Sequence, residues 1–422
     1  MDDPIAIHNE AIALRRRGRS NDALLEIERA LRLGSRFIET RLMHAHLLAD
    51  VGQFDEAVST YKTLLSEKPD LIDAHETLAK LLPQIGRGAE ALDSYRVALK
   101  QMPHIGMLWV SAMGSAKALG EPAQLLAWAR AAEARFGADT MIAVFAAYAL
   151  SATHQDIEAR DLLVTAITAE PDYVPAQTTL AHIILKMGDY KGAERAALAA
   201  TALAPHDQSA WALLSIIWRV LDDPREQWLA DYDQLVMPID LVGLNLPALT
   251  DLLNDKHQTQ DHPADQSLRG GSQTRGTLFE NEEPLLHSLQ HTITRAVLQQ
   301  LATLPADPTH PFLSRMGRGI SFAGSWSVRL RSAGFHINHM HPEGWLSSAL
   351  YIDLPAEVGE SDIGALAFGK PDGALGLNLS ARRIVQPRSG LLVIFPSFFW
   401  HGTLPFESVS NRLTVAFDAI PT

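Results

Sequence analysis

The chain of 422 residues contains no cysteine. This absence excludes disulfide bonds, thiolate nucleophiles and cysteine-based zinc sites, so a bound metal would have to be held by His, Asp or Glu. No apolar run approaches the length of a membrane span. The N-terminus also lacks the basic and apolar segments of a signal peptide. From these absences we expect a cytoplasmic protein.

Positive charge is scarce as well. The chain has 36 Lys and Arg residues against 49 Asp and Glu, a formal net charge of -13. Such an acidic chain is not expected to neutralise nucleic-acid phosphates or to dock on an anionic membrane surface. The run Arg15-Arg16-Arg17 is a local exception, for which we predict a solvated helix face. The length predicts two or three domains.

A regular repeat, with a period of about 34 residues, runs through the N-terminal half of the chain. Pro69 and Pro103 have the same separation as Pro171 and Pro205. Small residues fall into four columns of the same frame, each with one exception. The columns are Ala11, Ala45, Ala79, Ala147 and Ala181, with Met113 the exception; Ala23, Ala57, Ala91, Ala159 and Ala193, with Leu125 the exception; Ala30, Ala98, Ala132, Ala166 and Ala200, with Leu64 in the remaining place; and Gly18, Gly52, Gly86, Gly120 and Gly188, with His154 the exception. Small residues let two helices pack closely, Gly permits the turn between them, and Pro ends the second helix. The frame predicts six units that start near residues 4, 38, 72, 106, 140 and 174, followed by a capping helix at 208–221.

This pattern resembles the tetratricopeptide repeat. The resemblance implies a solenoid of helical hairpins whose concave face binds a protein or peptide, either as substrate or as partner. A dimerising or merely supporting role is the alternative.

Residues 222–320 are predicted to form a linker, a loop and a supporting helix. The polar segment 257–276 contains a Gly pair and predicts a long loop. Leucine, isoleucine and valine recur at helical spacing over 285–301, which predicts a helix on the outside of the sheet that follows.

Short runs with strand character follow from Ser321. Trp326, Val328 and Leu330 alternate with polar residues, and 345–354, 365–368, 391–395 and 413–417 are further candidate strands. Strands without intervening helices favour an antiparallel sandwich or barrel. The predicted fold class is therefore an α + β multidomain chain, with repeats and cap at 1–221, the linking segment at 222–320 and a jelly-roll barrel at 321–422.

Three histidines lie at candidate metal-binding positions among these strands. Residues i and i+2 of a strand share one face, so His339 and His341 can reach the same ion. His401 follows an apolar strand and the sequence Phe-Pro-Ser. Three nitrogens on one face of an iron leave positions open for a bidentate ligand and O2. His336 lies three residues before His339, hence on the opposite face of a regular strand, and is left out of the set.

Arg412 begins the last predicted strand and follows His401 closely in the chain. An Arg deep in a barrel needs an anion, and a carboxylate matches the fork of its guanidinium.

The order of His-x-His, Phe-Pro-Ser, distal His and late Arg resembles the double-stranded β-helix 2-oxoglutarate oxygenases. In particular it is similar to the putative 2OG-Fe(II) oxygenase family, often found behind tetratricopeptide repeats in bacteria. The segments FHINHMHPEGWLSSALY at 335–351 and FPSFFWHGTLPF at 395–406 carry this resemblance, which covers roughly residues 262–421.

The resemblance implies Fe(II), 2-oxoglutarate as co-substrate and, as an optional addition, ascorbate. It makes His339 the first metal ligand and His401 the distal ligand. It also makes Arg412 the clamp on the C5 carboxylate of 2-oxoglutarate, with Thr414 beside it. Tyr351 and Asn338 are predicted to line the co-substrate pocket.

Trp326 and Trp345 are further candidates for the pocket lining. Sheet packing is the alternative for each of these two tryptophans, and also for Tyr351 and Asn338.

The second metal ligand departs from the wider superfamily, which has an Asp where this chain has His341. A three-His set, a two-His set with water, and completion by Glu343 are all open, and we favour His341. The implied activity is hydroxylation of a protein or peptide side chain. The alternatives are a cupin-like metalloenzyme that does not use 2-oxoglutarate, in which Arg412 would have no task, and a non-catalytic repeat scaffold with a degenerate barrel.

Overall fold

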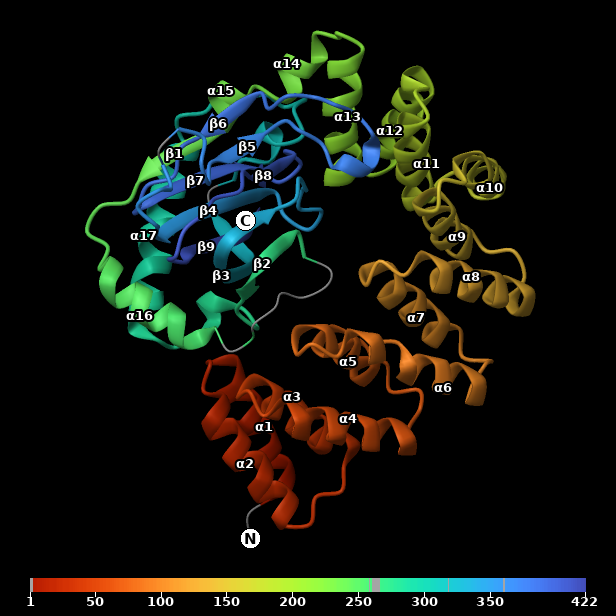
Figure 1. Cartoon of the computed structure of the whole chain (residues 1–422), viewed down its shortest axis with the longest axis vertical. Coiled ribbons are helices and arrows are strands. Elements are labelled where there is room, and N and C mark those ends of the chain that lie inside the picture. The colour runs from red at the N-terminus through yellow and green to blue at the C-terminus, as the bar shows by residue number, and fades with distance from the viewer. Residues whose placement is uncertain (1–2, 258, 260–265, 318, 360) are drawn as a thin grey trace.

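The computed structural model describes residues 3–257, 259, 266–317, 319–359 and 361–422. Figure 1 shows an arc of paired helices, coloured red to green, that leads into a domain of strands coloured green to blue.

The arc consists of helical hairpins in the predicted frame. Its helices are α1 (Pro4–Arg16), α2 (Ser20–Arg32), α3 (Ile38–Asp50), α4 (Phe54–Glu67), α5 (Ile72–Gln84), η1 (Gly88–Glu90), α6 (Asp93–Gln101), α7 (Gly106–Ala118), α8 (Pro122–Phe136), α9 (Thr140–Ala152), α10 (Asp156–Ala169), α11 (Val174–Lys186), α12 (Tyr190–Leu203) and α13 (Gln208–Val220). The first helices of the units begin at residues 4, 38, 72, 106, 140 and 174, which confirms the predicted repeat. Within these hairpins the column alanines Ala11, Ala45 and Ala181 are fully buried, as expected where two helices cross.

The residues at the turn between the two helices of each unit share one backbone conformation. Gly18, Gly52, Gly86, Gly120 and Gly188 have φ between 69° and 85°, and His154 follows them at 62°. Asp222, which stands one repeat period after Gly188, has a φ of 52°. Its position shows that α13 begins a shortened seventh unit, completed by α14 (Arg225–Leu229), where a lone capping helix was predicted.

The segment 222–320 contributes more than a linker to the fold. It contains α14, α15 (Tyr232–Leu235), β1 (Met237–Asp240), α16 (Leu246–Lys256), β2 (Leu268–Gln273), η2 (Leu278–Glu280), α17 (Pro284–Leu301) and η3 (Leu313–Arg315). The long loop predicted at 257–276 is wrong over 268–273, which is strand β2, while 258 and 260–265 lie outside the described residues. Strand β2 escaped prediction because it is polar and contains two glycines. A Cβ at Gly271 would collide with the carbonyl oxygen of Arg329 on the neighbouring strand.

Two antiparallel sheets form the C-terminal domain. Its further elements are β3 (Ile320–His336), β4 (Leu346–Asp353), β5 (Leu366–Phe368), η4 (Gly373–Leu375), β6 (Arg383–Val385), β7 (Leu391–Pro396), β8 (His401–Thr403) and β9 (Arg412–Pro421). Within the described residues, the large sheet has the order β1-β7-β4-β9-β3-β2 and the small sheet the order β6-β5-β8. This architecture confirms the predicted antiparallel two-sheet fold.

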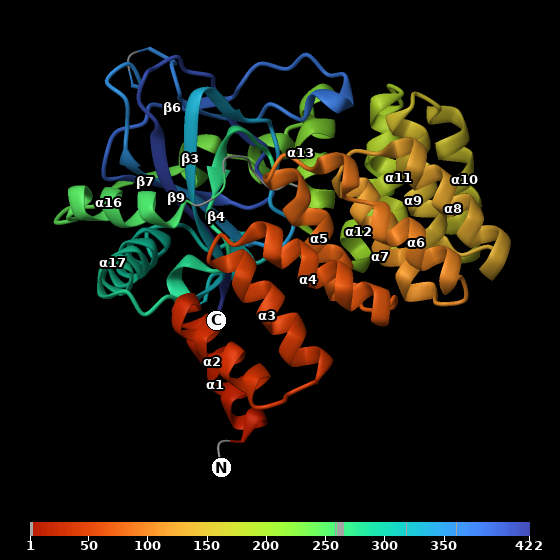
Figure 2. The same ribbon diagram turned by 60° about the horizontal axis from the view of Figure 1, so that its bottom comes forward.

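The two faces of the large sheet have different neighbours. Alternate residues of β9, among them Val415 and Phe417, belong to one apolar core with Leu289 and Ile293 of α17. Figure 2 shows α17 on the side of the strands that faces away from α8 to α11. The intervening residues of β9, beginning with Arg412, therefore point to the opposite, interior face.

The last repeats are packed directly against the strands. The Trp400 indole N–H donates to the carbonyl of Ala212 at 2.9 Å, and Arg219 donates to the carbonyl of Gly369 at 2.7 Å. Leu185 of α11 and Ile217 of α13 share the apolar core of the C-terminal domain. The end of the solenoid and the sheet domain therefore form one packed body.

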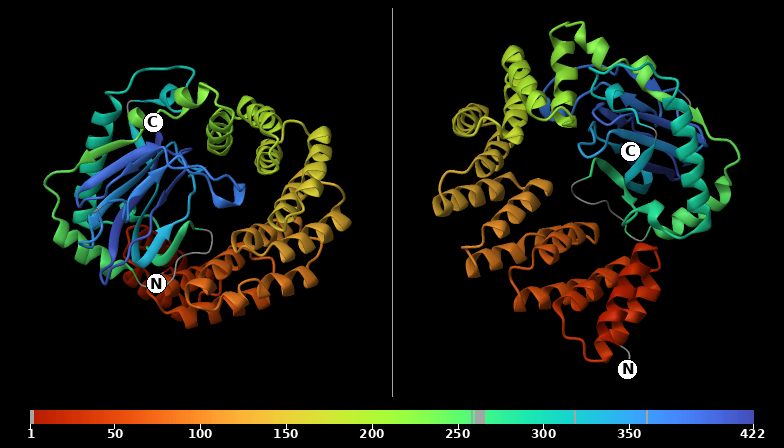
Figure 3. Two further views of the ribbon diagram at one scale, coloured as in Figure 1. Left: turned by 45° about the horizontal axis from the view of Figure 1, so that its top comes forward. Right: turned by 180° about the vertical axis from the view of Figure 1, so that it is seen from behind.

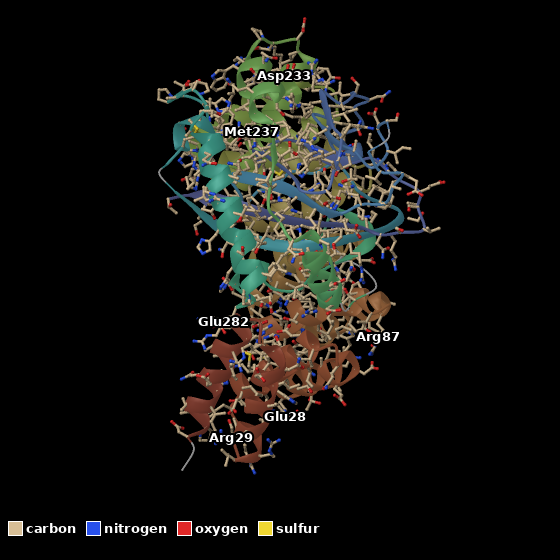
Figure 4. The ribbon with its side chains drawn as sticks, turned by 90° about the vertical axis from the view of Figure 1, so that its left-hand side faces the viewer. Glu28, Arg29, Arg87, Asp233, Met237 and Glu282 are labelled. Carbon is tan, nitrogen blue, oxygen red and sulfur yellow. The ribbon has the colours of Figure 1, made fainter. Side chains whose placement is uncertain are left out.

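The first repeat also touches the C-terminal domain. The backbone N–H of Glu282 donates to the carbonyl of Arg17 at 3.0 Å, and their side chains form an ion pair of 3.2 Å. Asp50 pairs with Arg275 at 3.6 Å. Figure 4 shows Glu282 where the red repeats meet the blue-green domain, and the left view of Figure 3 shows the arc that results. The sheet domain thus contacts both ends of the helical array.

These contacts correct the prediction for the arginine run. Arg16 and Arg17 are exposed, but Arg15 is half-buried and its Nε donates to Asp50 at 2.6 Å. The run therefore serves the junction between the first repeats and the sheet domain as well as facing solvent. In the part of the chain that the structure describes, every helix is too short or too polar to cross a membrane.

Candidate metal centre

The backbone brings His339 and His401 together. These residues form an isolated antiparallel bridge, in which each backbone N–H donates to the other's carbonyl at 2.9 Å. The backbone of His341 donates to the carbonyl of Ser397 at 3.0 Å. The segment after β3 is thereby pinned to the segment that leads into β8, although the two are far apart in the sequence.

The side chains of His339, His341 and His401 converge. One ring nitrogen of each lies within 4.8 Å of those of the other two. Nε2 of His339 lies 3.1 Å from Nε2 of His341. A set of this size matches the ligands of one metal ion, because three imidazole nitrogens about 2 Å from an ion lie roughly 3 Å apart.

The second nitrogen of each ring has its own hydrogen-bond partner. Nδ1–H of His339 donates to the carbonyl of Ile337 at 2.8 Å, and Nδ1–H of His401 to that of Phe399 at 2.9 Å. Nδ1–H of His341 donates to Oδ2 of Asp418 at 2.8 Å. A carbonyl can only accept, so these bonds fix the tautomer that leaves Nε2 with a lone pair for a metal.

Burial keeps the imidazoles of His339 and His401 neutral. It lowers the pKa of His339 to about 3, with a further contribution from the neighbouring His341. Burial also lowers the pKa of His401 well below its ordinary value, helped by His339 and His341. A neutral imidazole is the form that binds a metal, so the lowered pKa values of His339 and His401 favour metal binding at neutral pH.

The structure does not bring Glu343 into the cluster. Its side chain is exposed, and the group of possible ligands found among the described residues consists of the three histidines.

His336 lies closer to the cluster than the sequence predicted. Its ring stacks at 5.8 Å from that of His339, and the Ser267 hydroxyl lies 3.0 Å from Nδ1 of His336 and 3.1 Å from Nε2 of His339. The expectation that it points to the opposite face was wrong because β3 ends at His336. Beyond that residue the two-residue alternation of a strand no longer holds.

Arg412 is a buried cation without an acidic partner among the described residues. Its side chain is 3% exposed, and among the described residues Nε and Nη1 have no hydrogen-bond partner. Its guanidinium carbon lies 5.1 Å from the centre of the Tyr351 ring, and the hydroxyl of Tyr351 also lacks a partner there. Burial raises the pKa of Tyr351, against the effect of the Arg412 charge. Leaving a charge buried and unpaired is costly, so this corner suits an anionic ligand such as a carboxylate.

Arg412 lies on the same interior face of the large sheet as Asp418, the hydrogen-bond partner of His341. Arg412, Thr414 and Asp418 alternate along β9, and Tyr351 and Ser347 of β4 stand opposite Thr414 and Asp418. The Thr414 hydroxyl donates to the carbonyl of Val328 at 3.5 Å. One sheet face thus carries the unpaired guanidinium at one end and the partner of His341 at the other.

The remaining predicted pocket residues differ in their surroundings. The ring of Trp326 stacks on His341, 5.9 Å between centroids, so it lines the site. Trp345 instead stacks on Phe312 and donates to its carbonyl, which places it in the core. The Asn338 amide donates to the carbonyl of Pro371 at 3.2 Å, so this side chain tethers the turn before η4.

Sequence reasoning missed Asp418. It lies on the last strand, an even number of positions after Arg412, and this even spacing could have placed it on the same face. Nothing local, however, links it to His341, which is 77 residues away. Ser267 was missed for a similar reason, since it lies in a polar segment that predicted a loop.

Comparison with known proteins agrees with this geometry. Residues 324–418 match the family described as Putative 2OG-Fe(II) oxygenase. Residues 42–104 and 157–217 each match a tetratricopeptide repeat family. No curated protein matches the chain significantly.

Several solved structures resemble the helical part. A tetratricopeptide repeat protein from Parabacteroides merdae is 14% identical, with 60% of this chain and 97% of that chain covered and a TM-score of 0.41. PilW, a widely conserved type IV pilus biogenesis factor, is 16% identical, with 55% and 91% covered and a TM-score of 0.32. YrrB, a repeat protein with an unusual peptide-binding site, is 17% identical, with 44% and 95% covered and a TM-score of 0.31. From the family matches, the chain carries tetratricopeptide repeats within residues 42–217 and, at residues 324–418, a domain of the Putative 2OG-Fe(II) oxygenase family.

Proposed function

We propose that this protein is an Fe(II)- and 2-oxoglutarate-dependent oxygenase that hydroxylates a protein or peptide side chain presented by its repeats. One observation carries the proposal: three converging imidazoles lie near a buried Arg that has no anionic partner among the described residues. The family match over 324–418 supports the same reaction class.

In this proposal His339, His341 and His401 hold the iron through Nε2. Their Nδ1–H bonds to Ile337, Asp418 and Phe399 keep the rings oriented before the ion arrives. Three protein ligands on one side leave the other side open to small ligands. When bound, iron with 2-oxoglutarate supplies the O2-dependent oxidation that the side chains themselves cannot perform.

Arg412 is proposed to bind the distal carboxylate of 2-oxoglutarate. Nε and Nη1 of the guanidinium have no partner among the described residues, so each is available to donate to an oxygen of a carboxylate. Thr414 stands opposite Tyr351 on the neighbouring strand, and the Tyr351 hydroxyl has no hydrogen-bond partner among the described residues. Both side chains could therefore contribute polar contacts beside Arg412. Asn338 contributes indirectly, because its amide holds the 371 turn at the edge of the site.

The segment at Pro371, which the Asn338 amide tethers, also faces the repeats. Helix α11 lies against η4, and burial together with the nearby charge of Asp372 raises the pKa of Tyr148 on α9. Met107 and Tyr148 are exposed on first helices of the repeats, and the ammonium of Lys117 lies 4.7 Å from the Tyr148 ring. A peptide on this surface would lie beside the turn that Asn338 tethers, which favours presentation of substrate by the repeats.

Anaerobic binding tests the proposal directly. Adding Fe(II) and 2-oxoglutarate to the metal-free, full-length protein should produce a weak visible charge-transfer band. Admitting air should then yield succinate. A protein that binds iron but shows neither the band nor succinate would contradict 2-oxoglutarate chemistry. Failure to bind iron would contradict the metal centre itself.

A further inference from the structure

We propose that Asp418 is a positioning residue of the metal centre. It aligns His341 and supplies, one hydrogen bond away from the ion, the negative charge that a set of three neutral ligands lacks. This inference rests on the proposed function only in requiring a metal ion between the three histidines.

Both carboxylate oxygens of Asp418 accept hydrogen bonds from neighbouring side chains. Oδ2 accepts the Nδ1–H of His341 at 2.8 Å, and Oδ1 accepts the hydroxyl of Ser347 at 2.6 Å. Ser347 is in turn within 2.8 Å of the Ser397 hydroxyl. Asp418 is 8% exposed and Ser347 is fully buried, so water does not compete freely for these bonds. The carboxylate is therefore held in one orientation by the sheet itself.

The ring of His341 is fixed from two directions. Asp418 holds its Nδ1 edge, and the indole of Trp326 stacks on its face at an interplanar angle of 17°. The other two histidines differ, because their Nδ1–H groups donate to neutral backbone carbonyls. His341 is thus the cluster member that is bonded to a carboxylate.

This arrangement has a chemical consequence. A carboxylate that accepts the Nδ1–H of an imidazole raises the electron density at Nε2 and strengthens its bond to a metal. It also offsets part of the ionic charge in a site of low dielectric. The carboxylate of Asp418 lies 2.8 Å from Nδ1 of His341. We infer that Asp418 provides the carboxylate of a site whose direct ligands are all neutral.

The test uses the metal-free, full-length protein and Co(II) as a spectroscopic probe. The Asp418→Asn variant keeps the shape of the side chain and removes its charge. We expect its Co(II) affinity to fall roughly 10- to 100-fold. The visible bands of Co(II) at saturation should also shift, since the ligand field of His341 changes. Glu343→Gln, an exposed carboxylate two positions from His341, serves as the matched control and should change neither quantity.

The outcomes separate the two proposals. Asp418→Asn with an unchanged Co(II) affinity and spectrum would overturn the role of Asp418 while leaving the metal centre in place. An unmodified protein that does not bind Co(II) would overturn both.

A second variant covers the case in which Asp418→Asn does not fold. Ser347→Ala frees Oδ1 but keeps the charge, so it should weaken Co(II) binding by about fivefold, the effect of losing one hydrogen bond. Unchanged affinity in Ser347→Ala would then count against the proposal.

Discussion

The guanidinium carbon of Arg412 lies 5.1 Å from the centre of the Tyr351 ring, and both side chains are buried. Within the described residues, two guanidinium nitrogens and the tyrosine hydroxyl have no hydrogen-bond partner. A buried charge without a partner destabilises a fold by several kcal/mol. The pair therefore marks a place where the protein tolerates instability that a bound anion would relieve.

Arg412→Ala should abolish this anion site without disturbing the metal. We expect 2-oxoglutarate affinity to fall about 100-fold, as for the loss of a buried charge-assisted hydrogen bond, while Co(II) affinity stays unchanged. Isothermal titration with each ligand measures both effects. Arg412→Lys keeps the positive charge but loses the planar guanidinium. Its affinity for 2-oxoglutarate should therefore lie between that of the unmodified protein and that of Arg412→Ala.

Arg329→Ala provides a matched control for Arg412→Ala. Arg329 is on the same sheet, but it stands opposite Leu413 on the other face and donates to Asn254 and to the carbonyl of His257. Its removal should leave 2-oxoglutarate binding intact. Equal losses in the two variants would argue against a specific clamp at Arg412.

The identity of the third ligand can be decided by two substitutions. His341→Ala should reduce Co(II) affinity at least about tenfold, because one of three converging nitrogens is lost. Glu343→Ala should have no effect, since Glu343 is exposed and outside the cluster. Competition with a coloured chelator measures both affinities. The reverse pattern would make Glu343 the ligand and reject the three-histidine set.

We expect a glycine at the one turn position of the six repeats that holds His154 to stabilise the protein. His154 has a φ of 62°, where its five column partners are glycines, so His154→Gly should remove strain and raise the free energy of unfolding by up to about 1 kcal/mol. Gly120→Ala should lower it by about 1 kcal/mol, because no atom lies near the added Cβ and the φ of 69° alone is unfavourable. Urea denaturation measures both changes.

Gly114 supplies the control for these two variants. It lies inside helix α7 with an ordinary φ and open space around an added Cβ, so Gly114→Ala should stabilise the protein by about 1 kcal/mol. If Gly120→Ala also stabilised the protein, the requirement for a left-handed turn would be refuted.

We expect the buried His257 to lower the free energy of unfolding at acidic pH. It is buried between the hydroxyls of Ser272 and Ser327, and burial with the nearby Arg329 lowers its pKa to about 3. The unfolded chain takes up this proton near pH 6.5 and the folded chain does not. Stability is therefore complete above pH 6.5 and falls as the pH drops from 6.5 toward 3. At pH 5 the loss from this group amounts to at most about 2 kcal/mol.

Urea denaturation between pH 8 and pH 5 measures this loss. The pKa values of His339 and His401 are also lowered, and these residues add a pH dependence of their own. The informative quantity is therefore the difference between the unmodified protein and His257→Gln. The variant should lose less stability over this range. If the free energy of unfolding changed equally with pH in the unmodified protein and in His257→Gln, the expected contribution of His257 would be refuted.

The repeats were predictable because their physics is local. Each hairpin carries its own alanines, turn glycine and final proline, so the columns appear in the sequence and the helices begin at the expected residues. The prediction was incomplete at Asp222, where an acid replaces glycine and the seventh unit is short. There, a backbone conformation revealed a repeat that residue identity had hidden.

The sheet domain was predictable in class but not in its edges. Strands β3, β4, β7 and β9 are apolar or alternate between apolar and polar residues, and such patterns are recognisable in the sequence. Strands β1 and β2 are short and lie at the two edges of the large sheet, where pairing with one neighbour suffices and polar residues or glycines are tolerated. Their sequence therefore carries little strand signal.

The same division holds at the metal centre. The sequence by itself predicted that His339, His341, His401 and Arg412 form one site, from the two-residue spacing of the first two and the order of all four along the chain. Only the tertiary structure decided that Glu343 faces solvent, that His336 lies beside His339, and that His341 is held by Asp418 across 77 residues. Contacts of that kind depend on which strands become neighbours, and strand order follows from the packing of the whole domain.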